Sequence, residues 1–246
     1  MSTLEGYWNL YLWNNRWNKI FKNIELLKKE ENNFNPYQNN GGTVVSVSGK
    51  TFCIVAADTR CSNGFSIPTR FQTKIIKISK KILIATSGMF SDTKFLQKQI
   101  KNNIIEYQYS NSNNSNIFIE NCAFYISNLL YSKRFFPYYT FNLLSGLDKN
   151  DRGLVYNFDA IGSFEKVKFS SAGSGQFLIQ PLLDGHFGEK KENLFFDNNS
   201  IKDFVCSIRE FFLKASKRGI HIGDGLQFFI VCKKGILVEN YFLKID

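Results

Sequence analysis

The segment that most constrains the fold starts at Thr43, where two strand-like runs follow each other across a Gly-Lys turn. The first run, TVVSVS (43–48), alternates apolar and polar residues, which is the pattern of a strand with one buried face. The second run, TFCIVAAD (51–58), is almost continuously apolar, which indicates a strand that is buried on both faces. Such a pair is expected to lie inside a layered fold that covers it on each side.

Other parts of the chain provide the layers. Strands are predicted at 81–88, as a hairpin of 139–148 and 153–166 around KNDR, and at 226–232 and 236–243 around KKG. Helices are predicted from three apolar stripes with spacings of three and four residues. These stripes are Leu96, Ile100, Ile104 and Tyr107; Ile119, Ala123, Ile126 and Leu130; and Ile201, Phe204, Val205, Ile208, Phe212 and Ala215.

Two local signals mark the ends of these helices. The Asn/Ser-rich run at 110–116 is expected to be an exposed loop between the first two helices. Ser200 with Asp203 resembles a capping box that opens the third helix. The order of strands, two helices, strands, helices and strands favours a mixed α+β fold, in which helices cover each face of two stacked antiparallel sheets.

Composition excludes several classes of protein. The chain has 246 residues, of which 43% are hydrophobic, and it contains no apolar run of the roughly 18 residues that a membrane helix needs. Its five cysteines are scattered without a CxxC motif, and it has only two histidines. A disulfide framework or a metal site is therefore not expected, and neither is a cofactor.

The net charge of +10 raises the question of nucleic-acid binding. The basic residues are spread thinly, as in KIIKISKK (74–81), where they interrupt an apolar strand pattern and indicate a solvated face. No nucleic-acid-binding motif accompanies them. A free-standing RNA-binding protein remains an alternative from another functional class.

The first 33 residues differ from the rest of the chain. Their apolar residues recur at helical spacing, and Pro36 follows shortly after the polar run KKEENN. A flexible tail and a removable presequence that docks through an aromatic stripe are both compatible with this pattern. The stripe consists of Leu10, Trp13, Trp17, Ile20, Ile24 and Leu27.

Several short stretches resemble the β-type subunits of the 20S proteasome. They are FNPYQNNGGT (34–43), DTR (58–60), GFSI (64–67), SKRFFPYY (132–139), GLD (146–148), VYNFDAIGSFE (155–165), QPLLD (180–184) and GDGL (223–226). The resemblance runs from about residue 34 to the last residue and implies the αββα sandwich of the N-terminal-nucleophile hydrolases. It also implies a presequence at 1–33, one domain at 34–246 and a short tail at 34–41.

Active members of that family attack peptide bonds with an N-terminal threonine, so Thr43 is the first candidate for a nucleophile in this chain. The family's strand aspartate lies 16 residues after the nucleophile, and Asp58 is the aspartate that matches here. Counting back from Asp58 reaches Gly42, so Thr43 is one residue out of register and would face away from the pocket. A one-residue slip in the turn at 48–50 would restore Thr43, and an active hydrolase that uses Thr43 therefore stays open.

The other family positions are matched only in part. Lys74, Gly88 and Ser174 match the family's lysine, its oxyanion glycine and its supporting serine. Gly219 and Ile222 stand where the family has a second aspartate and a second serine. The resemblance thus implies a degenerate site without a nucleophile. Asp58 and Lys74 then form either a vestigial pocket or a structural ion pair between two strands, and the cost of a lone buried charge favours the ion pair.

The resemblance also implies a setting for the chain. It indicates a non-catalytic subunit that assembles with other α and β proteasome subunits into stacked seven-membered rings, 28 subunits in all. The neighbouring subunits would carry out ubiquitin-dependent and ATP-dependent protein degradation in the cytoplasm and nucleus. No metal, membrane or nucleic-acid partner is expected. RFFPYY (134–139) is a candidate contact with a neighbour, although a helix end in the core would suit it equally.

Overall fold

Two five-stranded antiparallel sheets form the centre of the molecule, which the computed structural model describes at residues 36–110, 117–188 and 201–243. The first sheet has the strand order β10-β1-β2-β11-β12. Its strands are β10 (Phe169–Gly173), β1 (Thr43–Ser48), β2 (Phe52–Asp58), β11 (Gly225–Cys232) and β12 (Gly235–Phe242). The strand-like runs at 43–48 and 51–58 thus form β1 and β2, which pair with each other as expected.

The second sheet has the strand order β5-β6-β7-β8-β9. Its strands are β5 (Ile75–Ser79), β6 (Ile82–Gly88), β7 (Thr140–Leu147), β8 (Gly153–Phe158) and β9 (Phe164–Val167). β7 and β8 are the predicted hairpin, but the stretch expected to continue to 166 divides into β8 and a separate strand, β9. A small hairpin of β3 (Cys61–Asn63) and β4 (Ser66–Thr69) leaves the end of β2.

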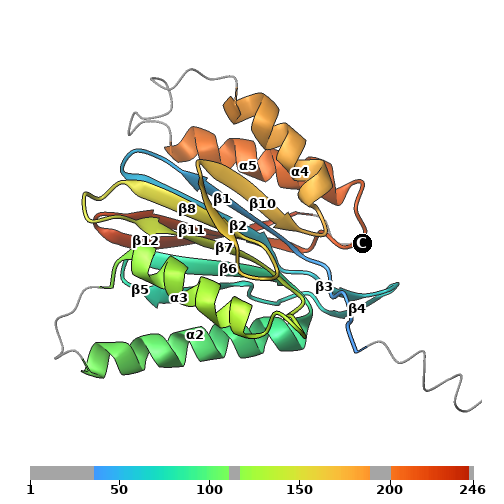
Figure 1. The fold of residues 1–246 in the computed structure, drawn as a ribbon. Coiled ribbons are helices and arrows are strands. Elements are labelled where there is room, and N and C mark those ends of the chain that lie inside the picture. The colour runs from blue at the N-terminus through green and yellow to red at the C-terminus, as the bar shows by residue number, and fades with distance from the viewer. Residues whose placement is uncertain (1–35, 111–116, 189–200, 244–246) are drawn as a thin grey trace, which may run out of the picture. The chain divides into compact units, whose positions relative to one another are not determined.

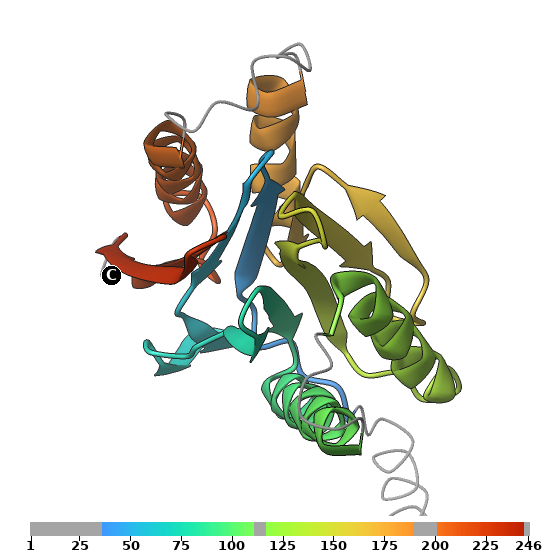
Figure 2. The same ribbon diagram turned by 90° about the vertical axis from the view of Figure 1, so that its left-hand side faces the viewer.

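Helices cover the outer face of each sheet, as Figures 1 and 2 show. On the second sheet lie α2 (Phe90–Ser110) and α3 (Ile119–Ser132). On the first sheet lie α4 (Gln176–Leu183), which continues as a short π-helix η1 (Asp184–Gly188), and α5 (Ile201–Ser216). The layers are therefore α, β, β and α, which confirms the predicted α+β sandwich.

Three apolar clusters correspond to the three interfaces between the layers. One joins α4 and α5 to the first sheet, one joins α2 and α3 to the second sheet, and one lies between the sheets. The predicted helix stripes are buried with one clear exception, Tyr107, whose side chain is 49% exposed near the end of α2. The predicted helix at 10–27, the loop at 111–116 and the cap at Ser200 lie outside the described residues.

Candidate functional site

The start of β1 determines which way the side chains at positions 42 and 43 face. Val45 packs into the core under α4 and α5, whereas Val44 packs into the core between the sheets. Because side chains alternate along a strand, Thr43 shares the face of Val45 and position 42 shares the face of Val44. The side chains at the two candidate nucleophile positions therefore face different sides of the first sheet.

Lys74 directly precedes β5 and lies on the same side of the first sheet as position 42. Its ammonium donates to the carbonyl of Asp58 at 2.7 Å, to Oδ1 of Asp58 at 3.0 Å and to the carbonyl of Arg60 at 2.7 Å. The side chain is only 1% exposed. An ammonium has three protons, so these three bonds occupy all of them. Lys74 is thus held in a fixed position between Asp58 and the carbonyl of Arg60.

Asp58 ends β2 and is completely buried. Its Oδ1 also accepts the backbone N–H of Thr43 at 2.7 Å. Burial raises the pKa of the Asp58 carboxyl, while the charge of Lys74 and the N–H of Thr43 act in the opposite direction. Within the described part of the chain Oδ2 makes no hydrogen bond of normal geometry, although the backbone N–H of Gly223 also lowers the pKa of this carboxyl. A buried carboxylate in this position depends on Lys74 to remain ionised.

Gly42 stands directly against this pair and has no space for a side chain. A Cβ built on Gly42 would lie 2.8 Å from Nζ of Lys74 and closer still to its Cε. Its φ of +84° lies in the left-handed region that favours glycine. Its carbonyl accepts the N–H of Ser174 at 3.0 Å and the Ser174 hydroxyl at 3.3 Å. Ser174 therefore supports the backbone of Gly42 from the turn between β10 and α4.

The hydroxyl of Thr43 is engaged on the other face of the strand. Oγ1 accepts the N–H of Gly175 at 2.9 Å, and the residue is fully buried. Gly175 is the residue before α4, and a Cβ there would collide with both Thr43 Oγ1 and Ile222. This hydroxyl helps to seat the start of α4 on β1, and its hydrogen-bond partner lies on the α4 side of the sheet.

The remaining matched residues lie at nearby ends of elements. Gly88 closes β6 with a φ of +115°, and a Cβ there would overlap the carbonyl oxygen of Tyr139. Gly219 and Ile222 follow α5, and Ile222 is 2% exposed in the core under α4 and α5. The position that would carry a supporting hydroxyl is thus filled by an apolar side chain.

A second buried ion pair beside the site was not found from the sequence. Arg60 donates from Nε to Oδ2 of Asp224 at 2.9 Å and from Nη1 to the carbonyl of Ile220 at 2.9 Å. Arg70 forms a further ion pair with Asp224, whose φ is +64°. The DTR and GDG motifs contain Arg60 and Asp224, but 164 residues separate the partners. Only the fold brings these two motifs together.

The residues just before Gly42 are held in place by hydrogen bonds to other parts of the fold. Asn40 accepts the N–H of Ser62 through its carbonyl, and its side chain bonds the carbonyl of Ser62 and the N–H of Phe90. Ser62 in turn lies 2.7 Å from Nδ1 of His221. A Cβ on Gly41 would stand 2.6 Å from the Ser62 hydroxyl. The segment from Gln38 to Gly42 is therefore a fixed lead into β1.

Other kinds of site are not found in the residues that the structure covers. No group of three or more histidine, cysteine, aspartate or glutamate side chains could hold a metal ion within them. The cysteines Cys53, Cys61, Cys122, Cys206 and Cys232 are all free. None of the helices described is long and apolar enough to span a membrane.

Comparison with known proteins gives consistent matches. The family described as "Proteasome subunit" matches residues 38–231. Proteasome subunit beta type-1 of Dictyostelium discoideum is 40% identical over 216 residues, which cover 87% of this chain and 91% of that protein. The protein of the same name from Petunia hybrida is 39% identical over 225 residues, 89% of this chain and all of that protein. Proteasome subunit beta type-6 of Saccharomyces cerevisiae is 35% identical over 225 residues, 88% and 93% of the two chains.

Proposed function

Because this chain belongs to the proteasome subunit family, and its relatives are β subunits, we propose that it is a non-catalytic β subunit of the 20S core particle. Its place would be the sixth position of the β ring. There it would contribute chamber wall and ring contacts, while neighbouring subunits cleave peptide bonds. The observation that carries this proposal is Gly42, which stands against Lys74 and Asp58 and has no side chain to attack a carbonyl.

The contacts around Gly42 support the same reading. The ammonium of Lys74 has three acceptors, on Asp58 and Arg60, which use all of its protons in contacts within the fold. Thr43 is the first residue of β1 and follows a fixed segment, and its N–H is bound by Asp58. In the alternative that uses Thr43 as nucleophile, the same nitrogen would be a free amine that serves as the base. The Asp58–Lys74 pair is then a structural tie between the end of β2 and the start of β5.

Exposed aromatic residues support a role in assembly. Phe135 and Phe136 in RFFPYY are 87% and 64% exposed, and Arg134 stacks over the Phe135 ring. Phe177 on α4 is 87% exposed. Large exposed rings of this kind are typical of surfaces that other chains cover. Cytoplasm and nucleus, where such particles would work, belong to the same proposal.

A covalent probe tests the proposal. A threonine-directed epoxyketone is added to the intact particle, and labelled peptides are identified by mass spectrometry. We expect label on the catalytic neighbours and none on this chain, because position 42 offers no hydroxyl. Label that maps to Thr43 would instead establish the alternative, a catalytically active N-terminal threonine hydrolase.

A further inference from the structure

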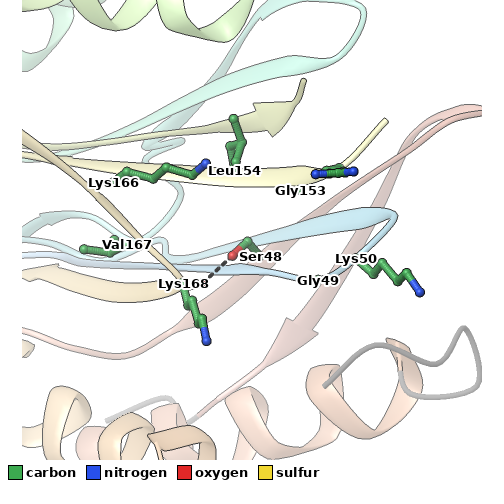
Figure 3. A pocket seen from close by; sticks show the side chains of 9 residues that line it. Ser48, Gly49, Lys50, Gly153, Leu154, Lys166, Val167 and Lys168 are labelled. Atoms are coloured by element: carbon green, nitrogen blue, oxygen red, sulfur yellow. Dashed lines mark hydrogen bonds between the residues drawn. The ribbon is translucent and has the colours of Figure 1, made fainter. Parts of the chain in front are cut away.

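A pocket of about 540 Å³ lies between the two sheets at the end of β1 that is distant from Thr43. Figure 3 shows Lys166, Leu154 and Gly153 along one wall, and Ser48, Gly49, Lys50 and Lys168 along the other. The lining residues are Ser48, Gly49, Lys50, Arg152, Gly153, Leu154, Lys166, Val167 and Lys168. β1 spans about 17–20 Å from Thr43 to Ser48, so this pocket is separate from the site around Gly42.

Hydrogen bonds hold the residues of one wall together and also join the two walls. The N–H and the hydroxyl of Ser48 both donate to the carbonyl of Lys168 at 2.7 Å. The N–H of Gly153 donates to the carbonyl of Gly49 at 3.2 Å. Lys168 is the single residue between β9 and β10, where the chain crosses from one sheet to the other. The pocket is therefore a preformed feature of the fold.

The charge of this pocket has one sign. Four of its nine lining residues are cationic, none is acidic, and all four cations are exposed. Among the residues that the structure describes, the side chains of Lys50, Arg152 and Lys166 form no ion pair and no hydrogen bond. The exposed charges of Lys50, Arg152 and Lys166 create a local positive potential that attracts anions.

The two carboxylates in the turn just before Arg152 have other partners. Asp151 forms ion pairs with Lys81 and with Lys233. Asp148 accepts the backbone N–H groups of Asn150 and Arg152, and so closes the turn between β7 and β8. Both carboxylates thus have partners of their own.

We propose that this pocket is a docking site for an acidic peptide segment of a partner polypeptide. The cations stand on opposite walls and three of the four are lysines, an arrangement suited to several carboxylates rather than to one bidentate anion. β9 is also the last strand of its sheet, so no described strand pairs with its outer edge, and an edge of this kind is one at which extended peptides add. The inference rests on the pocket itself and not on the catalytic state of position 42.

Binding of a defined peptide to the full chain tests this proposal. The probe is a fluorescein-labelled Glu-Asp-Leu-Glu-Asp peptide, followed by anisotropy, with a Gln-Asn-Leu-Gln-Asn peptide as its neutral control. The double variant Arg152→Glu/Lys166→Glu reverses two pocket charges. The double variant Lys101→Glu/Lys202→Glu reverses two exposed charges on α2 and α5 and is the matched control. Circular dichroism verifies that both variants fold.

The expected result is at least about a tenfold loss of affinity in the pocket variant and less than about twofold in the control. Carbodiimide coupling should join the peptide to Lys50, Lys166 or Lys168. Equal losses in the two variants, coupling confined to other lysines, or no binding of the acidic peptide would overturn the proposal. So would displacement of the peptide by an equal concentration of tripolyphosphate, because the pocket would then be a general anion site.

Discussion

The side chain of Lys74 occupies the space that a side chain at Gly42 would need. Nζ of Lys74 lies 2.8 Å from the point where a Cβ on Gly42 would stand, and the same nitrogen bonds Asp58 and the carbonyl of Arg60. Lys74 could move aside only by losing these bonds in a buried region. The missing side chain at position 42 and the buried ion pair are therefore two aspects of one packing arrangement.

Alanine at position 42 is expected to destabilise the chain more than alanine at Gly64. Both glycines have positive φ, so each substitution costs about 1 kcal/mol in backbone strain. A Cβ on Gly64 meets nothing within 4 Å, whereas a Cβ on Gly42 collides with Lys74. We expect Gly42→Ala to lower the free energy of unfolding by about 2–4 kcal/mol in urea denaturation. Equal effects of the two variants would show that Lys74 gives way freely.

Removal of the Lys74 charge should expose the cost of burying Asp58. Lys74→Met is expected to lower the free energy of unfolding by about 3–5 kcal/mol at pH 7, because an unpaired carboxylate is left behind. The exposed Lys77→Met on β5 is the control, with an effect below about 0.5 kcal/mol. A Lys74→Met variant as stable as this control would contradict the structural role of the pair.

The same variant should depend on pH in a defined direction. Burial already raises the pKa of Asp58, and the loss of Lys74 would raise it further. A carboxyl whose pKa is higher in the folded chain favours unfolding as pH rises above the unfolded value of about 3.9. The penalty of Lys74→Met should therefore shrink as pH falls toward that value. Urea titrations at several pH values measure this, and a penalty that grows in acid would contradict it.

The apolar residue at position 222 is expected to be structural. Ile222 is 2% exposed and belongs to the core under α4 and α5, so Ile222→Ser should destabilise the chain by about 2–4 kcal/mol. Ile220, two residues earlier, is 60% exposed, and Ile220→Ser should cost less than about 0.5 kcal/mol. Similar unfolding midpoints for the two variants would argue against this assignment.

Thiol labelling provides a test of the core. Burial raises the pKa of Cys53 and of Cys122 from 9.0 to about 12, whereas Cys206 is exposed. Iodoacetamide at pH 8.5 should modify Cys206 in the folded chain, and Cys53 and Cys122 only after urea is added.

Because the pKa values of Cys53 and Cys122 are higher in the folded chain, stability should fall as pH rises above about 9. Peptide mass spectrometry and urea midpoints report the two effects, and modification of Cys53 without urea would be inconsistent with this core.

Local periodicity was sufficient to predict most of the fold, and it failed where packing is not periodic. The runs that became β1, β2, β6 and β11 alternate or are continuously apolar, so their burial could be inferred from neighbouring residues. The hairpin of β3 and β4 is short, contains Pro68 and has no such pattern. Tyr107 fits the α2 stripe but stays exposed near the end of that helix.

The candidate site could be predicted only as a set of positions. A fixed spacing in the sequence related Gly42, Asp58 and Lys74, and the fold brings these three residues into contact. The contact of Ser62 with His221 and the pair of Arg60 with Asp224 span 159 and 164 residues. No local signal specifies contacts of that range, and they follow from the pairing of β2 with β11.

The mature N-terminus of this chain in assembled particles tests the central claim most directly. Self-cleavage before a threonine needs a hydroxyl at the nucleophile position, which we propose is position 42, and Gly42 has none. Intact mass and N-terminal sequencing should be done on normal particles and on particles whose neighbouring nucleophiles are replaced by alanine. The account predicts a terminus between about Glu30 and Asn35 in normal particles, and a longer presequence when the neighbours are inactive. A terminus at Thr43 that forms even with inactive neighbours would contradict it.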